Sequence, residues 1–389
     1  MPALLLPLSL LFRLSTAYAA DDTPPPPAAT GIGTSPTAPP KHPGGVVPIA
    51  TVAQIPPWLR GDVALNYSYD RLGGHLNEAE LMDPGATESA DVQVGQRTLN
   101  SHVLSIDAIF SAGPGVAVTL GLPIHIADSI DFGTSQTMVY DPTTGSGTMN
   151  GTEAVDLGVL ATGGGLEGAW IGIAGTPFSE AFAKRKNRVT WRIGGALRTP
   201  NKNNFYVETD GKRGAGDGGL GFRIDNAFST TIGGSQPYIT GRYQTDGKTS
   251  IDAVDADGNP VVTDLQGAKS GNFRFGAEFL AAHNAQQDTD VRVDLHAAFD
   301  YASWSTVPSG LYLPGVLNGT AGLPVQTSES ADIGGGLGFS FQPVQYLRIG
   351  LYGQVEYHLP QKIESPYPIY TAGDTIHSLA GANLTIRIR

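Results

Sequence analysis

Residues 118–126 read VTLGLPIHI, with an aliphatic side chain at every second position. Successive side chains of a β-strand point to opposite faces, so a period of two places all the aliphatic residues of this stretch on one face. The other face carries the small or polar residues Thr119, Gly121 and His125. The stretch is therefore predicted to be a strand that turns one face to an apolar medium.

The same alternation returns along the chain, each time ended by a break. The predicted strands are residues 63–69, 104–110, 118–126, 166–174, 189–197, 220–230, 238–244, 273–281, 291–301, 333–341, 347–357 and 376–388. They number about twelve, and single-chain bacterial outer-membrane barrels have an even number of strands. We therefore predict an all-β fold, a closed antiparallel transmembrane β-barrel of about twelve strands.

The predicted connections between these strands alternate in length. Long ones at 71–97, 128–164, 200–217, 246–270, 302–329 and 360–373 are separated by short or moderate ones at 111–114, 176–187, 233–236, 284–288 and 342–344. Long outer loops and short periplasmic turns are typical of an outer-membrane barrel with both termini on the periplasmic side. A soluble sandwich has no physical reason for this rhythm, and its strands are shorter.

Composition excludes several classes of protein. After the N-terminal segment no window is apolar enough for a membrane helix. A net charge of −12 leaves no basic face for nucleic acid. The chain has no cysteine, which removes thiolate metal sites, disulfides and a lipidated anchor. We expect no cofactor and no metal.

The N-terminal part is expected to direct export. Residues 1–20 hold an apolar run followed by Ala17-Tyr18-Ala19, a pattern suited to signal peptidase, although no Lys or Arg precedes the run. Residues 21–57 are rich in proline and cannot bury enough apolar area to order themselves, so they are expected to be a disordered periplasmic spacer. The barrel is expected at 58–389, in the cell outer membrane.

Local patterns carry a family resemblance. The segments GLEGAWIGIA at 165–174 and GALRTP at 195–200 are similar to patterns of transporter-type barrels associated with aromatic-compound degradation. The chain as a whole, over 58–389, resembles Gram-negative outer-membrane channel proteins of about twelve strands. The resemblance implies outer-membrane lipid, lipopolysaccharide and the barrel-assembly machinery as partners. The chain departs from it at the C-terminus, where LTIRIR at 384–389 lacks the usual final aromatic residue.

If the apolar faces meet lipid, the opposite faces form the interior. The residues predicted to line a pore are Asp107, Arg192, Arg223, Asp225, Arg242, Arg274, Glu278, Arg292, Asp294, His296, Arg348 and Glu356. Arginines and carboxylates are interleaved in this set, so one interpretation is structural ion pairing between strands. The other is a set of charges that acts on a permeating solute. The two interpretations are compatible with each other.

A dozen strands enclose a lumen that is wider than a filled eight-stranded core and narrower than a general porin. We therefore expect a passive channel for small hydrophilic or amphiphilic solutes. The alternative is a structural or surface-interaction barrel with a plugged lumen.

Other motifs are weak. The glycine patterns at 163–168 and 216–221 match a dinucleotide fingerprint but do not lie between a strand and a helix. Residues 252–259 resemble a calcium loop but have Ala253 at a ligand position, so we expect an external Asp-Gly turn. The pairs Ser101-His102 and His377-Ser378 point to opposite faces of a strand, so no catalytic site is expected.

Overall fold

The computed structural model describes most of the predicted barrel. The described residues are 53, 55–56, 60–79, 91–131, 134–140, 147–156, 159–180, 189–201, 219–254, 260–284, 289–308, 324–364 and 369–388. The chain divides into two units, and the first, Met1–Ser35, lies wholly outside these residues. The second, Pro36–Arg389, contains every strand discussed below.

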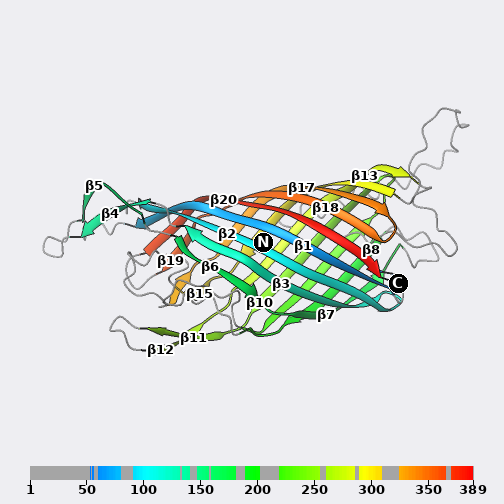
Figure 1. Cartoon of the computed structure of the whole chain (residues 1–389), viewed down its shortest axis with the longest axis horizontal. Helices are drawn as coiled ribbons and strands as arrows, with labels where there is room; N and C mark the ends of the chain where they lie inside the picture. The colour runs from blue at the N-terminus through cyan, green and yellow to red at the C-terminus, as the bar shows by residue number, and fades with distance from the viewer. Residues whose placement is uncertain are drawn as a thin grey trace, which may run out of the picture. The chain divides into compact units, whose positions relative to one another are not determined.

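Twelve of the described strands form one closed antiparallel ring (Figure 1). The last strand pairs with the first, from Gly61 with Ile388 to Glu78 with Tyr370, so the ring has no open edge. Closure confirms the predicted fold. The ring consists of β1 (Gly61–Ala79), β2 (Asp91–Gly113), β3 (Val116–Asp131), β7 (Trp170–Phe178), β8 (Val189–Arg198), β9 (Gly221–Thr230), β10 (Ser235–Asp246), β13 (Lys269–Asn284), β14 (Thr289–Ala302), β17 (Ser330–Val344), β18 (Leu347–His358) and β20 (Ile369–Ile388).

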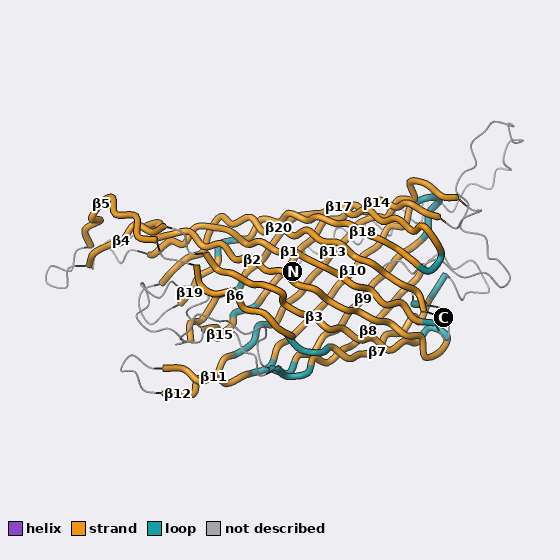
Figure 2. The backbone as a smooth tube through the Cα atoms, in the orientation of Figure 1, coloured by secondary structure: helices purple, strands orange, loops and turns teal. Residues whose placement is uncertain are grey.

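Each ring strand contains most or all of one predicted strand, and ring neighbours are consecutive in the chain. Tight connections join β2 to β3, β9 to β10 and β17 to β18 at one end of the ring. Gly61 and Ile388 are paired at this same end, which is the periplasmic end in the predicted orientation. Figure 2 shows the long connections gathered at the other end.

The long connections differ from the sequence interpretation because they contain strands. The ring strands β1, β2 and β20 continue well past their predicted limits, and eight shorter strands accompany them. The shorter strands are β4 (Thr134–Tyr140), β5 (Gly147–Asp156), β6 (Val159–Leu166), β11 (Thr249–Val254), β12 (Pro260–Leu265), β15 (Ser305–Pro308), β16 (Pro324–Thr327) and β19 (Gln361–Glu364). Strands β11 and β12 pair on either side of the expected Asp-Gly turn, and the turn itself, 255–259, lies outside the described residues.

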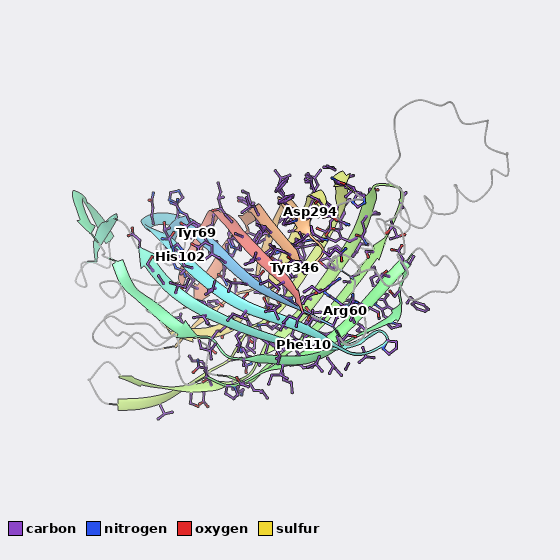
Figure 3. All side chains as sticks on the ribbon, turned by 45° about the vertical axis from the view of Figure 1, so that its right-hand side comes forward. Arg60, Tyr69, His102, Phe110, Asp294 and Tyr346 are labelled. Atoms are coloured by element: carbon purple, nitrogen blue, oxygen red, sulfur yellow. The ribbon has the colours of Figure 1, made fainter. Side chains whose placement is uncertain are left out.

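The outer surface of the ring is apolar. Ile173 and Leu337 are 68% and 61% exposed, whereas Asp62 and Arg387 on the inner face are 6% and 4% exposed. This inversion of the usual arrangement suits a barrel whose outer wall meets hydrocarbon, because a closed ring leaves no backbone group unpaired in lipid. Figure 3 shows the side chains that stand off the outer surface, among them Phe110. No helix in the described part of the chain is long and apolar enough to cross a membrane.

Aromatic side chains occupy both ends of this apolar wall. Near the tight connections Phe178, Trp191 and Phe228 stack across three adjacent strands, with ring centroids 6.0 and 5.5 Å apart. Toward the other end the ring of Tyr69 lies 4.8 Å from that of His102. Aromatic girdles at both interfaces are a feature of membrane barrels. The molecule is therefore an outer-membrane type of barrel.

Candidate functional site

The candidate site is the inner wall of the ring. Because side chains alternate along each strand, the residues between the exposed apolar positions point inward. All twelve residues predicted to line a pore lie on ring strands, and the structure distributes them among separate clusters.

The first cluster is basic. Arg192, Arg223, Arg242 and Arg274 lie on the four adjacent strands β8, β9, β10 and β13. Asp225 is their nearest acidic partner, with its carboxylate oxygens 3.0 Å from Nε of Arg223 and 2.6 Å from Nε of Arg242. One carboxylate therefore serves two of the four guanidinium groups.

The other two arginines have no such partner. Arg192 and Arg274 make no hydrogen bond or ion pair to any of the described residues, and Nε of Arg274 is buried without an acceptor. Both line a cavity of about 440 Å³ in the inner wall, together with Arg242 and the aspartates Asp225, Asp300 and Asp332. The cavity therefore offers its contents charges of both signs, including two guanidinium groups without a hydrogen-bond or ion-pair partner among the described residues.

Asp107 on β2 lies on the inner wall of another part of the ring. Its carboxylate accepts hydrogen bonds from Nδ2 of Asn66 at 2.6 Å and from Oγ of Ser105 at 2.8 Å, and the residue is exposed. Asp107 thus places a negative charge on a different part of the inner wall from the basic cluster.

A second cluster lies toward the tight connections and is closely paired. Arg292 lies 3.4 Å from a carboxylate oxygen of Glu278 and 3.2 Å from one of Asp290. Arg348, which is 9% exposed, donates to Gln342. For Glu278 and Arg292 the ion-pair interpretation describes the contacts well, because buried charges require partners, whereas the contact of Arg348 is with the neutral amide of Gln342.

A third cluster lies toward the long connections and is rich in histidine. His296 is bonded through Nδ1 to Asp294 at 2.7 Å and through Nε2 to Gln354 at 3.0 Å. Gln354 in turn donates to Glu356 at 2.7 Å. Glycine is required at Gly336 beside this chain, since a Cβ atom there would lie 2.7 Å from the His296 ring.

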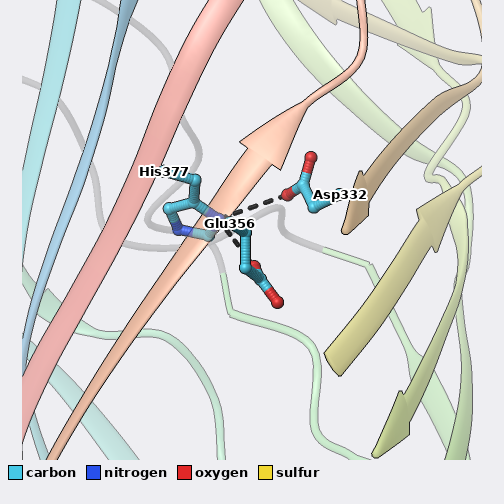
Figure 4. Close-up of side chains that lie close together, drawn as sticks. All are labelled: Asp332, Glu356 and His377. Carbon is cyan, nitrogen blue, oxygen red and sulfur yellow. Dashed lines mark hydrogen bonds and ion pairs between the residues drawn. The ribbon is translucent and has the colours of Figure 1, made fainter. Parts of the chain in front are cut away.

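The predicted pore-lining set contains Asp294, His296 and Glu356 of this cluster and omits its other members. Glu356 lies 3.2 Å from Nδ1 of His377, which also contacts Asp332 at 3.2 Å (Figure 4). His377 reaches Asp70 through its other ring nitrogen at 2.6 Å, and His358 is bonded to Asp332. Asp70, Asp332 and His358 each lie one residue outside a predicted strand, whereas His377 lies within the predicted strand 376–388 and is absent from the predicted pore-lining set.

A fourth cluster contains Ser101, His125 and Asp128. Ser101 donates to Asp128, and Nδ1 of His125 lies 2.7 Å from Asp128 and 3.5 Å from Oγ of Ser101. A catalytic triad needs the serine and the carboxylate on different nitrogens of the ring. Here both contact the same nitrogen, so the cluster does not have the geometry of a hydrolase.

Glu167, between β6 and β7, extends this fourth cluster. It contacts Nε2 of His125 at 3.6 Å and accepts a hydrogen bond from Arg198 at 2.8 Å. Burial alone would raise the pKa of the Glu167 carboxyl, but its contact with His125 and the charge of Arg198 outweigh burial, so the pKa lies below its usual value. Arg198 also pairs with Asp246 at 3.0 Å, which links β8 to β10.

A small apolar cluster lies on the inner wall near the tight connections. Ile55, from the proline-rich segment, packs with Ala117 and Ala174, and Ile109 lies against them. Both alanines are buried between outward-facing neighbours on β3 and β7, so Ile55 lies inside the ring. Most of residues 21–57, predicted to be a spacer, lie outside the described residues.

Comparison with known proteins finds likeness only among solved structures. No protein-family model matches the chain, and no curated protein matches it. A Pseudomonas aeruginosa FadL homologue is 10% identical with a TM-score of 0.36, covering 84% of this chain and 90% of that one. The P. putida toluene transporter TodX is 8% identical with a TM-score of 0.34, covering 84% and 90%. The outer membrane channel DcaP of Acinetobacter baumannii is 11% identical with a TM-score of 0.25, covering 84% and 97%.

Proposed function

We propose that the chain forms a passive outer-membrane channel for small hydrophilic or amphiphilic solutes. The observation that carries the proposal is the cavity lined by Arg192, Arg242 and Arg274, two of which have no hydrogen-bond or ion-pair partner among the described residues. An inward charge without a protein partner is costly unless water or a solute reaches it. Solvated cationic groups on an inner wall are what a polar permeation path requires.

The twelve predicted residues then divide by role. The basic cluster and Asp107 act on the solute, because charges that line a pore set its ion preference. The closely paired residues Glu278, Arg292 and Arg348 hold the wall together instead. With two guanidinium groups unpaired at the cavity, the channel is expected to prefer anions.

Planar-bilayer recording of the purified full-length chain tests the proposal. Single channels are expected, and the reversal potential in a salt gradient should show a preference for anions. Arg274→Gln should lower that preference, because it removes one unpaired positive charge from the cavity. Lys362→Gln removes the same charge from an exposed position on β19 and should leave the reversal potential nearly unchanged. Repeated insertion of intact barrels without conductance, both for the wild type and for a chain that lacks residues 21–57, would refute the channel.

A second candidate, a barrel with a plugged lumen that serves as a structural or surface-interaction protein, is favoured by two observations. Ile55 packs inside the ring, and inner-wall side chains such as Arg198 and Gln342 are only 2% and 1% exposed. Deletion of residues 21–57 separates the two functions. If the wild type is silent and the deletion conducts, the segment closes a channel; if neither conducts, the second candidate holds.

A further inference from the structure

Asp332, Glu356 and His377 come from three adjacent strands, β17, β18 and β20, and converge on one point of the inner wall (Figure 4). One donor atom from each lies within 4.8 Å of the other two. Nδ1 of His377 is 3.2 Å from Oδ2 of Asp332 and 3.2 Å from Oε2 of Glu356. Two ligands bound to tetrahedral Zn²⁺ at about 2.0–2.1 Å are roughly 3.4 Å apart, so the spacing suits a shared ion.

Each of the three side chains also contacts a further side chain through its second polar atom. Nε2 of His377 lies 2.6 Å from Asp70. The second oxygen of Asp332 is bonded to His358, and Oε1 of Glu356 accepts from Gln354 at 2.7 Å. In metal sites a ligating histidine donates its other N–H to a carboxylate, and ligating carboxylates are themselves hydrogen-bonded. The remaining donor atom of each group, Oδ2 of Asp332, Oε2 of Glu356 and Nδ1 of His377, therefore faces the other two.

An independent observation concerns Glu356, which is 2% exposed. Its Oε2 atom, the one that faces His377, is buried and accepts no hydrogen bond. A buried carboxylate oxygen without a donor is unfavourable, and a cation at the centre of the cluster would satisfy it. The cluster also has more acid than base, with the carboxylates of Asp70, Asp332 and Glu356 against two imidazoles.

We propose that Asp332, Glu356 and His377 bind a divalent transition-metal ion of the Zn²⁺ type. A neutral imidazole nitrogen with two carboxylates favours Zn²⁺ and similar ions over Mg²⁺ and Ca²⁺, which prefer oxygen ligands alone. The three protein ligands leave one position of a tetrahedral ion for water or a solute. The ion would tie the last strand of the ring, β20, to β17 and β18.

Titration calorimetry with ZnCl₂, on tag-free full-length protein folded in detergent, tests this site. The wild type is expected to bind one Zn²⁺ per chain with saturation, and His377→Ala and Glu356→Gln should abolish that binding. Asp70→Asn should weaken it by about 10–100-fold, because it removes the carboxylate that orients the imidazole. His283→Ala is the matched control, since His283 is exposed at the end of β13 and should not affect binding.

Two further measurements distinguish a loss of metal binding from a loss of folding. The heat-modifiable gel mobility of membrane barrels shows whether each variant has folded, and Glu356→Gln keeps the size of the side chain. Co²⁺ in place of Zn²⁺ should give the visible absorption of a tetrahedral ion in the wild type and lose it in His377→Ala. The proposal is overturned if folded wild type shows no saturable Zn²⁺ binding, or if His377→Ala and His283→Ala bind alike. Either result would leave a hydrogen-bonded network as the role of the cluster, and neither bears on conductance.

Discussion

The ion pair between Asp62 and Arg387 closes the ring and gives the sharpest test of stability. The two residues are 325 positions apart and lie on β1 and β20. Arg387 donates from Nε to Oδ1 of Asp62 at 2.7 Å and from Nη2 to Oδ2 at 2.9 Å. Because both side chains are buried on the inner wall, removal of Asp62 takes from the Arg387 guanidinium the carboxylate to which it donates two hydrogen bonds.

We expect Asp62→Ala to lower the free energy of unfolding by about 3–5 kcal/mol. Two hydrogen bonds to charged groups at about 1.5–3 kcal/mol each give a similar figure. Guanidinium unfolding of the barrel in lipid vesicles, followed by the fluorescence of its four tryptophans, measures the change. Glu364→Gln, at an exposed position on β19, is the control and should change stability by less than about 0.5 kcal/mol.

A double variant distinguishes two contributions to the loss of stability, the lost ion pair and the cost of a buried charge that has lost this partner. Asp62→Leu with Arg387→Met replaces both charges by apolar groups and should cost less than Asp62→Ala alone. The reasoning fails if Asp62→Ala costs less than about 1 kcal/mol, which is the range of an exposed ion pair. It fails equally if the double variant is the less stable of the two.

Two further predictions concern the outer wall and Glu167. Leu337→Arg should lower the stability of the barrel in vesicles by about 2–4 kcal/mol, which is the cost of an arginine that faces the bilayer midplane. Leu337→Phe should be tolerated, and equal stability of the two variants would contradict a lipid-facing wall. The pKa of Glu167 is lower in the folded protein, so its contribution to stability is present above the unfolded pKa and is lost as pH falls through the folded one. Glu167→Gln should therefore flatten the acid side of a plot of unfolding free energy against pH, and an unchanged slope would argue against the contact with Arg198.

The positions of the strands in the sequence could be predicted because a lipid-facing strand needs an apolar residue at every second position. The apolar positions at 347–357 predicted β18 almost to its limits, Leu347–His358, since every outward residue there meets the apolar medium. Strands β1 and β20 extend beyond their predicted limits, to Ala79 and from Ile369. Outside the hydrocarbon no alternation is demanded, but the neighbouring strand still supplies backbone hydrogen bonds, so pairing continues without a sequence signal.

The inner wall was predicted less completely. The alternation of side chains along a strand identified inward-facing residues such as Arg274 and Glu356. It did not identify the residues that contact them. His377 and Asp70 are 307 positions apart and come together only because β20 closes on β1. Similarly, Ser101 points to the opposite face from its neighbour His102, and only the register of β2 with β3 sets it opposite Asp128 and beside His125.

By itself, the sequence determined that the chain is a ribbon of antiparallel strands with one apolar face and one charged face, because that alternation is local and repeats along every strand. The tertiary structure decided which charges pair, which arginines line a cavity, and where three strands bring a histidine and two carboxylates together. These depend on strand register and ring closure, which are set by hydrogen bonds between distant segments and leave no mark on the spacing of residues within any one of them.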